Sequence, residues 1–191
     1  MWVGNSQRLN SGGQKMTSYQ ILYADPPWDY YGDPNKNAAA GKHYKLMTKE
    51  AIGNISVPHD KKCVLFLWAT CPKLNDALWV LDKWGFHYRG IAWVWVKTSK
   101  AGKIIYGQGV RPTFTKPTTE LVLVGSTNKK GRTFSIKDEA MGQVILAPRE
   151  QHSKKPSVVR DNIVKILGDL PRLEMFARQY TPGWDCFGDQ L

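Results

Sequence analysis

The sequence predicts an α/β fold in which a mostly parallel sheet is covered by helices on both faces. Apolar runs of strand length alternate along the chain with segments of helical periodicity, and this order is typical of parallel sheets. The 191 residues are enough for one domain with a substantial core. We therefore expect a single domain over residues 18–191, after a polar, Gly/Ser/Asn-rich and disordered leader over residues 1–17.

The first part of the domain predicts a strand, a short helix and a second strand. Residues 19–24 and 63–68 are nearly continuous apolar runs, which is typical of strands buried on both faces. Between them, Thr48 can cap a short helix over residues 48–54 by accepting a hydrogen bond from a free backbone N–H. These segments begin the alternation of strand and helix.

A longer helix and three strands follow. Pro72 suits the first turn of a helix and Gly85 suits its end. The next strand, over residues 86–97, is rich in aromatic side chains, whereas residues 120–124 and 144–147 are shorter apolar runs. The face of the helix that we expect to turn toward the core carries Leu74, Ala77, Leu78 and Leu81.

The last part of the chain predicts one more helix and one more strand. Val159, Ile163 and Ile166 recur at helical spacing within residues 156–167, so we expect them to face the core. Residues 173–177 follow as a short apolar run that we expect to be the last core strand.

The composition favours a polyanionic partner. Lys and Arg outnumber Asp and Glu by 27 to 16, the net charge is +11, and eight Trp and eight Tyr accompany this excess. Three cysteines without CxxC or Cys/His ligand spacing predict a reducing cytosol and no metal site. No apolar stretch approaches the roughly 20 residues that span a bilayer, and the first residues lack the apolar middle of a signal peptide. We expect a cytoplasmic protein without membrane contact.

The most informative segment is Asp25-Pro26-Pro27-Trp28, which directly follows the first predicted strand. Open α/β sheets place their chemistry at the carboxyl ends of strands. Asp25 and the carbonyl of Pro26 can accept the two N–H groups of an adenine amino group while Trp28 stacks on the ring. This nitrogen is a poor nucleophile because it is conjugated with the ring, and the arrangement turns its lone pair toward an electrophile. The alternative is a stiff turn, since proline fixes φ and extends the preceding residue.

Three long polar or basic connections are candidates for substrate contact. Residues 29–45 follow the motif directly, carry Tyr30 and Tyr44, and can close over a flipped base. Residues 98–118 combine basic and aromatic side chains, which suits a nucleic-acid backbone and exposed bases. A solvated charged loop is the alternative there, and both interpretations also apply to residues 129–137. The basic candidates in the second connection are Lys100, Lys103, Arg111 and Lys116.

The segment before the last predicted helix can bind an anion. Residues 151–157 bring Lys155 and Pro156 to a helix start, where free backbone N–H groups and the helix dipole attract negative charge. The anion could be the carboxylate of a methionine-type cofactor or a phosphate. His152 is a lone loop histidine, which is more often a bystander than a catalyst, so we assign it no role.

Several further motifs occur in a fixed order after the Asp-Pro-Pro-Trp segment. They occupy residues 44–47, 65–68, 120–125, 155–156, 173–178 and 183–184. This order resembles that of the MTA-70 (MT-A70) family of adenine-N6 methyltransferases, and the resemblance runs from about residue 19 to the last residue. Several motifs in one order are far more specific than one motif alone.

The resemblance implies a Rossmann-like fold that uses S-adenosylmethionine, with the motifs permuted so that the catalytic motif comes first and the cofactor motifs come last. This order agrees with the absence of Gly-x-Gly-x-x-Gly after the first predicted strand. By this resemblance Asp25, Pro26, Pro27 and Trp28 are catalytic, Asp25 and Pro26 also contact the cofactor, and Tyr44 lies near the target base. The other implied cofactor residues are Lys155, Pro156, Ser157, Glu174, Met175, Phe176, Arg178, Tyr180, Asp189 and Gln190.

The sequence departs from the family pattern at Asp189, where family members commonly carry Asn. An ionised carboxylate only accepts hydrogen bonds, but ribose hydroxyls donate them, so ribose binding should survive.

The compact size resembles that of bacterial and phage members of the family, which act on DNA. We therefore expect methylation of adenine N6 in DNA, with Trp28 and Tyr44 stacking on a base flipped out of the duplex. An RNA adenosine methyltransferase is the nearer alternative. A non-catalytic nucleic-acid-binding paralogue is the other, although the intact motif speaks against it. A homodimer is a further expectation, because larger relatives pair two such folds.

Overall fold

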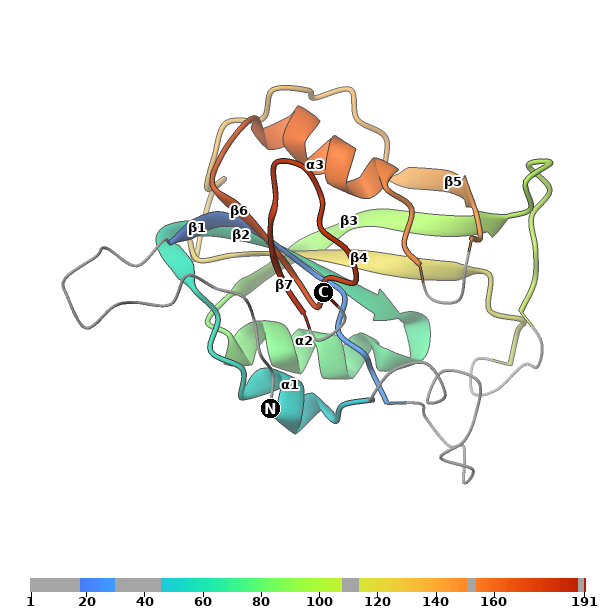
Figure 1. The fold of residues 1–191 in the computed structure, drawn as a ribbon, viewed down its shortest axis with the longest axis horizontal. Coiled ribbons are helices and arrows are strands. Elements are labelled where there is room, and N and C mark those ends of the chain that lie inside the picture. Colours follow the sequence, from blue (N-terminus) through green and yellow to red (C-terminus); the bar gives the residue numbers. More distant parts are fainter. Residues whose placement is uncertain (1–17, 30–45, 108–113, 151–153, 189–190) are drawn as a thin grey trace.

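The computed structural model describes residues 18–29, 46–107, 114–150, 154–188 and 191, and the following account concerns these residues. They form one seven-stranded sheet with helices packed on it (Figure 1). In chain order the elements are β1 (Tyr19–Ala24), α1 (Lys49–Gly53), β2 (His59–Thr70), the 3₁₀ turn η1 (Cys71–Lys73), α2 (Leu74–Lys83), β3 (His87–Thr98), β4 (Thr119–Ser126), β5 (Val144–Pro148), α3 (Val158–Leu167), β6 (Arg172–Met175) and β7 (Asp185–Phe187).

The strands lie side by side in the order β5-β3-β4-β2-β1-β6-β7. Strand β4 runs antiparallel to both of its neighbours, and the other four pairings are parallel. The prediction of a mostly parallel sheet is therefore confirmed. Because β4 alone is reversed, its first residues lie at the edge where the other strands end, and Glu120 pairs there with Thr70 of β2.

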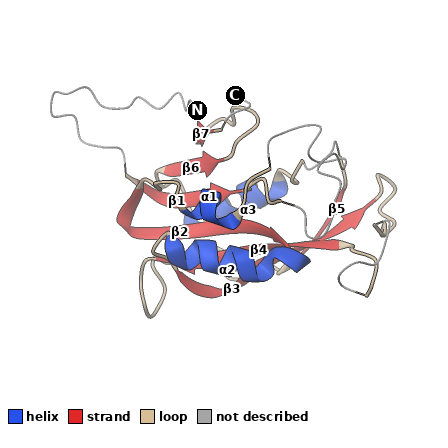
Figure 2. Cartoon of the chain, turned by 90° about the horizontal axis from the view of Figure 1, so that it is seen from below, coloured by secondary structure: helices blue, strands red, loops and turns tan. Residues whose placement is uncertain are grey.

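Helices cover both faces of the sheet, as predicted. In Figure 1, α3 lies on one face and α1 with α2 on the other. Figure 2 looks onto the α1 and α2 face, where α2 lies across the middle strands. Alternating side chains of β1 serve the two faces: Leu22 and Ala24 pack in the cluster that contains α1 and α2, and Ile21 and Tyr23 pack in the cluster that contains α3.

The predicted helices differ from the observed ones only near their ends. Thr48 caps α1 as expected, because its hydroxyl accepts a hydrogen bond from the backbone N–H of Ala51. Pro72 lies in η1, one turn before α2 begins, and Gly85 follows the helix with φ of 82°. In α3 it is Leu167 that is buried beside Val159 and Ile163, whereas Ile166 is half-buried against the same cluster.

One strand was not predicted. Strand β7 is three residues long, lies at the edge of the sheet and pairs only with β6. Its residues follow Gly183 and include the exposed Asp185, so neither an apolar run nor a clear alternation marks it. None of the helices in the described part of the chain is long and apolar enough to cross a membrane.

Candidate active site

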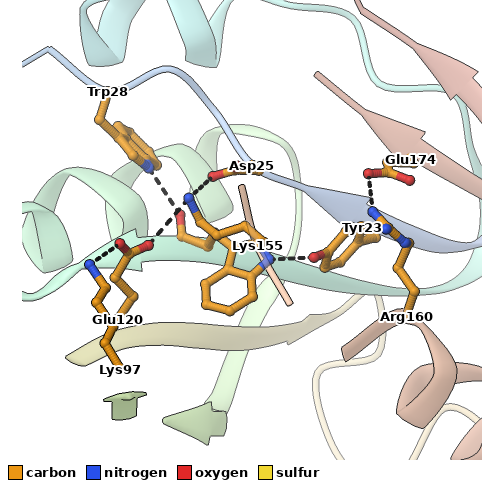
Figure 3. Close-up of polar contacts among 9 residues, drawn as sticks. Tyr23, Asp25, Trp28, Lys97, Glu120, Lys155, Arg160 and Glu174 are labelled. Carbon is orange, nitrogen blue, oxygen red and sulfur yellow. Dashed lines mark hydrogen bonds and ion pairs between the residues drawn. The ribbon is translucent and has the colours of Figure 1, made fainter. Parts of the chain in front are cut away.

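Four charged side chains from separate strands and loops meet at the carboxyl edge of the sheet (Figure 3). Asp25 directly follows β1, and Lys155 lies between β5 and α3. Glu120 is near the start of the reversed strand β4, and Lys97 is near the end of β3. The single antiparallel strand therefore brings a carboxylate to an edge that otherwise collects strand ends.

The four groups form one chain of alternating charge. Lys155 Nζ lies 2.9 Å from Asp25 Oδ1 and 3.2 Å from Glu120 Oε2, and Lys97 Nζ lies 2.7 Å from Glu120 Oε1. Each of these side chains is at most 24% exposed. Two lysines and two carboxylates give a local charge of zero when all four are ionised. A balanced set is needed here, because an unpaired charge with so little solvent would be costly.

The two carboxylates of this chain differ in their electrostatics. Burial raises the pKa of Asp25 above its usual range, and the Lys155 ammonium opposes this effect only in part. Burial also acts on Glu120, but Lys155 and Lys97 outweigh it and hold the pKa of Glu120 below its usual range. The pKa of Lys155 is raised, because its two carboxylate partners outweigh burial. Glu120 is thus the more firmly ionised carboxylate, and Asp25 is the one that accepts a proton more readily.

The Pro26-Pro27-Trp28 segment is fixed by hydrogen bonds. The backbone N–H of Trp28 donates to the carbonyl of Pro26 (2.8 Å), and the N–H of Met47 donates to that of Pro27 (2.8 Å). The indole Nε1 of Trp28 donates to the carbonyl of Trp68 in β2 at 2.9 Å. The segment is therefore a stiff turn, as one interpretation predicted. A turn alone gives no reason for the half-buried Asp25 carboxylate and its ion pair with Lys155.

A hydrogen-bonded aromatic pair, Trp68 and Tyr23, lies next to the Pro-Pro-Trp turn. The indole of Trp68 donates to the hydroxyl of buried Tyr23 at 2.7 Å, and its ring lies 5.5 Å from Lys155 Nζ. Trp68 also packs edge-on against Trp95, with centroids 6.0 Å apart. Trp28 and Lys155 thus share one rigid support, so the Asp-Pro-Pro-Trp segment and the β5–α3 connection are held in one geometry.

A second ion pair lies at the end of β6. The buried Glu174 carboxylate accepts hydrogen bonds from Arg160 of α3 (2.7 Å) and from the hydroxyl of Thr181 (3.2 Å). Burial raises the pKa of Glu174, and Arg160 opposes this effect. The pair ties the helix after Lys155 to the strand that the sequence assigned to the cofactor.

The backbone after β6 is tightly folded. Phe176 has φ of 61°, a value that non-glycine residues rarely adopt, and it is buried. The N–H of Ala177 donates to the carbonyl of Phe187 at 3.0 Å. A Cβ on Gly188 would overlap the carbonyl oxygen of Ala177. The connection after β6 and the end of β7 therefore approach so closely that only glycine fits between them.

The structure brings together part of the predicted site. Asp25 and Lys155 are in direct contact, and the predicted cofactor residues of β6 lie next to this edge. Lys100, Lys103 and Lys116 are exposed in the connection between β3 and β4. Ser157 is exposed and makes no side-chain cap of α3. The remaining described cofactor candidates are the buried Pro156, Met175 and Phe176, the half-buried Arg178 and the exposed Tyr180. Five candidates lie outside the described residues: Tyr30, Tyr44, Arg111, Asp189 and Gln190.

The sequence interpretation missed Glu120 and Lys97. Glu120 opens an apolar strand, a place where an acidic residue is commonly only a solvated strand end. Residues 120–125 belong to the motifs of the resemblance, but placing Glu120 beside Asp25 also required the direction of β4, which the sequence does not give. Arg160 was missed for a similar reason, since it is one of several charged residues on α3. In the described ranges, no three His, Cys, Asp or Glu side chains are grouped as a metal site requires.

Comparisons with known proteins agree with the predicted resemblance. The family model described as MT-A70 matches residues 19–190. The type II methyltransferase M.MunI of Mycoplasma sp is 33% identical, over 91% of this chain and 78% of the relative. The N6-methyladenosine RNA methyltransferase MTA1 of Pyricularia oryzae is 26% identical, over 93% of this chain and 48% of the relative.

A plant relative matches the chain as well. The N(6)-adenosine-methyltransferase MT-A70-like of Arabidopsis thaliana is 27% identical, over 91% of this chain and 24% of the relative. The chain thus spans most of the Mycoplasma enzyme and less than half of the fungal and plant relatives. The family match over nearly the whole chain confirms the resemblance seen in the sequence: the chain belongs to the MT-A70 family.

Proposed function

We propose that the protein is an S-adenosylmethionine-dependent methyltransferase that acts on the N6 amino group of adenine in DNA. The observation that carries this proposal is the placement of Asp25. Its carboxylate stands at the carboxyl edge of the sheet, at the head of a hydrogen-bonded Pro-Pro-Trp turn, and Lys155 holds it at 2.9 Å. A rigid acceptor beside a rigid aromatic ring is what the orientation of an adenine amino group requires.

The chemistry of the donor set fits S-adenosylmethionine. The Asp25 carboxylate suits a cationic group, while Lys155 and the half-buried Arg178, which interacts electrostatically with Asp25, suit a carboxylate. The tight backbone at Phe176 begins the connection after β6, which Gly188 at the end of β7 approaches closely, and nucleotide cofactors bind beside such strand ends. We assign the holding of the cofactor to these residues, together with Asp189 and Gln190. The cofactor would supply a methyl group activated by a sulfonium sulfur.

The residues of this chain act on the adenine by orientation and electrostatics. Asp25 accepts a hydrogen bond from one N–H of the amino group. The carbonyl of Pro26 already accepts from Trp28, and its second lone pair can accept the other N–H. Trp28 offers its half-buried ring for stacking. Positive charge that develops on the amino nitrogen is stabilised by the Asp25 carboxylate.

DNA is the substrate that we favour. The type II methyltransferase of Mycoplasma sp is spanned over 78% of its length, whereas the fungal and plant relatives named after adenosine methylation are spanned over less than half. Lys100, Lys103 and Lys116 are exposed after the end of β3, so a phosphate backbone could approach the edge that holds Asp25. The fungal relative is named an RNA methyltransferase, which makes adenosine in RNA the second candidate. In duplex DNA the base would be flipped out at a cost of about a few kcal/mol.

The substrate test offers the purified protein radiolabelled S-adenosylmethionine with duplex DNA, single-stranded DNA or RNA of matched sequence. We expect label in DNA. Label in RNA alone would move the assignment to the second candidate. Binding of nucleic acid without any transfer, by a folded protein that also fails to bind the cofactor, would identify a non-catalytic binding module.

A further inference from the structure

Two members of the charged chain have no part in the proposed reaction. The ion pairs of Glu120 are with Lys155 and Lys97, and these pairs continue the line that begins at Asp25. Glu120 is 12% exposed and has a lysine ammonium on each of its two oxygens. A purely structural strand end would not require two half-buried charges of each sign.

The proposed reaction explains why the positive charge of Lys155 must be compensated by a nearby negative charge. A sulfonium methyl donor is positively charged, and transfer moves that charge to the amino nitrogen that Asp25 contacts. Lys155 places a second positive charge beside the same carboxylate, at 2.9 Å. In a site with little solvent this ammonium would repel both the donor and the methylated nitrogen unless another anion compensated it. Glu120 lies 3.2 Å from Lys155 and is that anion.

We propose that Glu120 is a positioning residue that acts through Lys155: it cancels the positive charge of Lys155, so that the Asp25 carboxylate stays available to the cationic donor and the reacting nitrogen. Lys97 pairs with the second oxygen of Glu120, so that the four side chains together carry no excess of negative charge. The inference rests on the proposed function and adds to it the source of the site's selectivity for a positively charged cofactor.

The other described charges near this edge do not replace Glu120. Arg178 acts electrostatically on Asp25 and is itself positive, so it adds to the need for an anion. Glu174 is bonded to Arg160 at 2.7 Å, and this pair balances itself. Asp25 cannot balance Lys155 by itself, because its carboxylate is needed by the cationic donor and the reacting nitrogen. Two carboxylates of the described residues thus pair with Lys155, those of Asp25 and Glu120.

The test compares S-adenosylmethionine with S-adenosylhomocysteine, which has the same frame but an uncharged thioether sulfur. Calorimetric titration gives a dissociation constant for each compound with the wild type and with Glu120→Gln, which keeps the shape and an acceptor oxygen. We expect Glu120→Gln to weaken binding of the sulfonium compound about tenfold and to leave binding of the thioether within about twofold.

A second variant reverses the change in charge. Glu120→Gln leaves the four-residue set at +1, and adding Lys97→Gln returns it to zero, so the double variant should recover most of the preference for the sulfonium compound. Lys97→Gln alone should increase that preference a few-fold, and this arm does not depend on the folding of Glu120→Gln. Glu139→Gln is the matched control: it removes an exposed carboxylate that is paired with Arg132, and it should change neither constant.

The outcomes separate the inference from the proposed function. Equal weakening of both compounds by Glu120→Gln, or no recovery in the double variant, would overturn the charge-balancing role while leaving the methyltransferase assignment intact. A wild-type protein that binds neither compound and transfers no methyl group would overturn the proposed function, and the inference with it.

Discussion

Asp25 and Glu120 differ in what they are expected to contact, although both lie on Lys155. Replacing either by its amide removes one negative charge from the same chain of groups. Only Asp25→Asn also alters the group that orients the adenine amino group, because it replaces one acceptor oxygen of Asp25 by an N–H donor. We expect Asp25→Asn to lower the rate constant of transfer by roughly 10²–10³-fold, and Glu120→Gln by roughly tenfold. Single-turnover transfer at saturating cofactor measures both. Equal losses in the two variants would contradict a direct contact between Asp25 and the base.

The lowered pKa of Glu120 has a consequence for stability. Its pKa in the folded protein lies below the value of 4.5 for a free side chain, so ionised Glu120 stabilises the fold at neutral pH. This contribution is present above about pH 4.5 and is lost as the pH falls through the folded value. We expect Glu120→Gln to lower the free energy of unfolding by about 2–4 kcal/mol at pH 7.

Urea denaturation of wild type and Glu120→Gln at a series of pH values tests this expectation. The difference between the two proteins should narrow as the pH falls below about 4.5, the free side-chain value. A difference that stayed constant across the series would mean that Glu120 stabilises the fold by packing and not by its charge.

At the scale of the elements, the Arg160–Glu174 pair joins α3 to β6. Arg160→Met would leave Glu174 buried, with only the hydroxyl of Thr181 as a described side-chain partner. We expect this variant to lose about 3–5 kcal/mol of unfolding free energy, because breaking a buried pair strands the remaining charge. The double variant Arg160→Met/Glu174→Gln should be more stable than Arg160→Met alone. Thermal or urea unfolding of the wild type, Arg160→Met, Glu174→Gln and the double variant gives the comparison, and additive losses would show that the pair is not coupled.

The close approach of the connections after β6 and β7 gives another prediction. Gly188→Ala would force a Cβ against the carbonyl of Ala177 and push the two segments apart. We expect cofactor binding to weaken about tenfold or more and the fold to lose about 1–3 kcal/mol. Gly142→Ala is the matched control, since a Cβ there meets no neighbouring atom and should have little effect. Normal cofactor binding by Gly188→Ala would separate this backbone contact from the site.

The elements themselves were largely predictable from local patterns. The apolar run of β1 and the cap of α1 at Thr48 carry strong signals, because burial on both faces and a free helix N–H each demand particular residues. Strand β7 carries none, since three edge residues satisfy few constraints. The left-handed conformation of Phe176 could not be predicted either, because non-glycine residues rarely adopt it. It depends on the long-range contact between the residues after β6 and the end of β7.

For the whole molecule, the direction of one strand decides what the site contains. The order of motifs led to Asp25 and Lys155, but Glu120 and Lys97 join them only because β4 runs against its neighbours. Strand direction depends on which partners pair at long range, and the residues within β4 do not encode it locally. Asp25 and Lys155 were therefore predicted as site residues from the motifs, whereas the contacts that Glu120 and Lys97 make with them were not.

The central claim is that this edge of the sheet methylates adenine N6 in DNA and that Asp25 makes the reaction possible. The most direct measurement incubates duplex DNA with S-adenosylmethionine that carries a deuterated methyl group, and then analyses the digested nucleosides by mass spectrometry. The account predicts labelled N6-methyldeoxyadenosine with the wild type and a strong loss of it with Asp25→Asn. Label on another nucleoside, or an unchanged yield with Asp25→Asn, would contradict it.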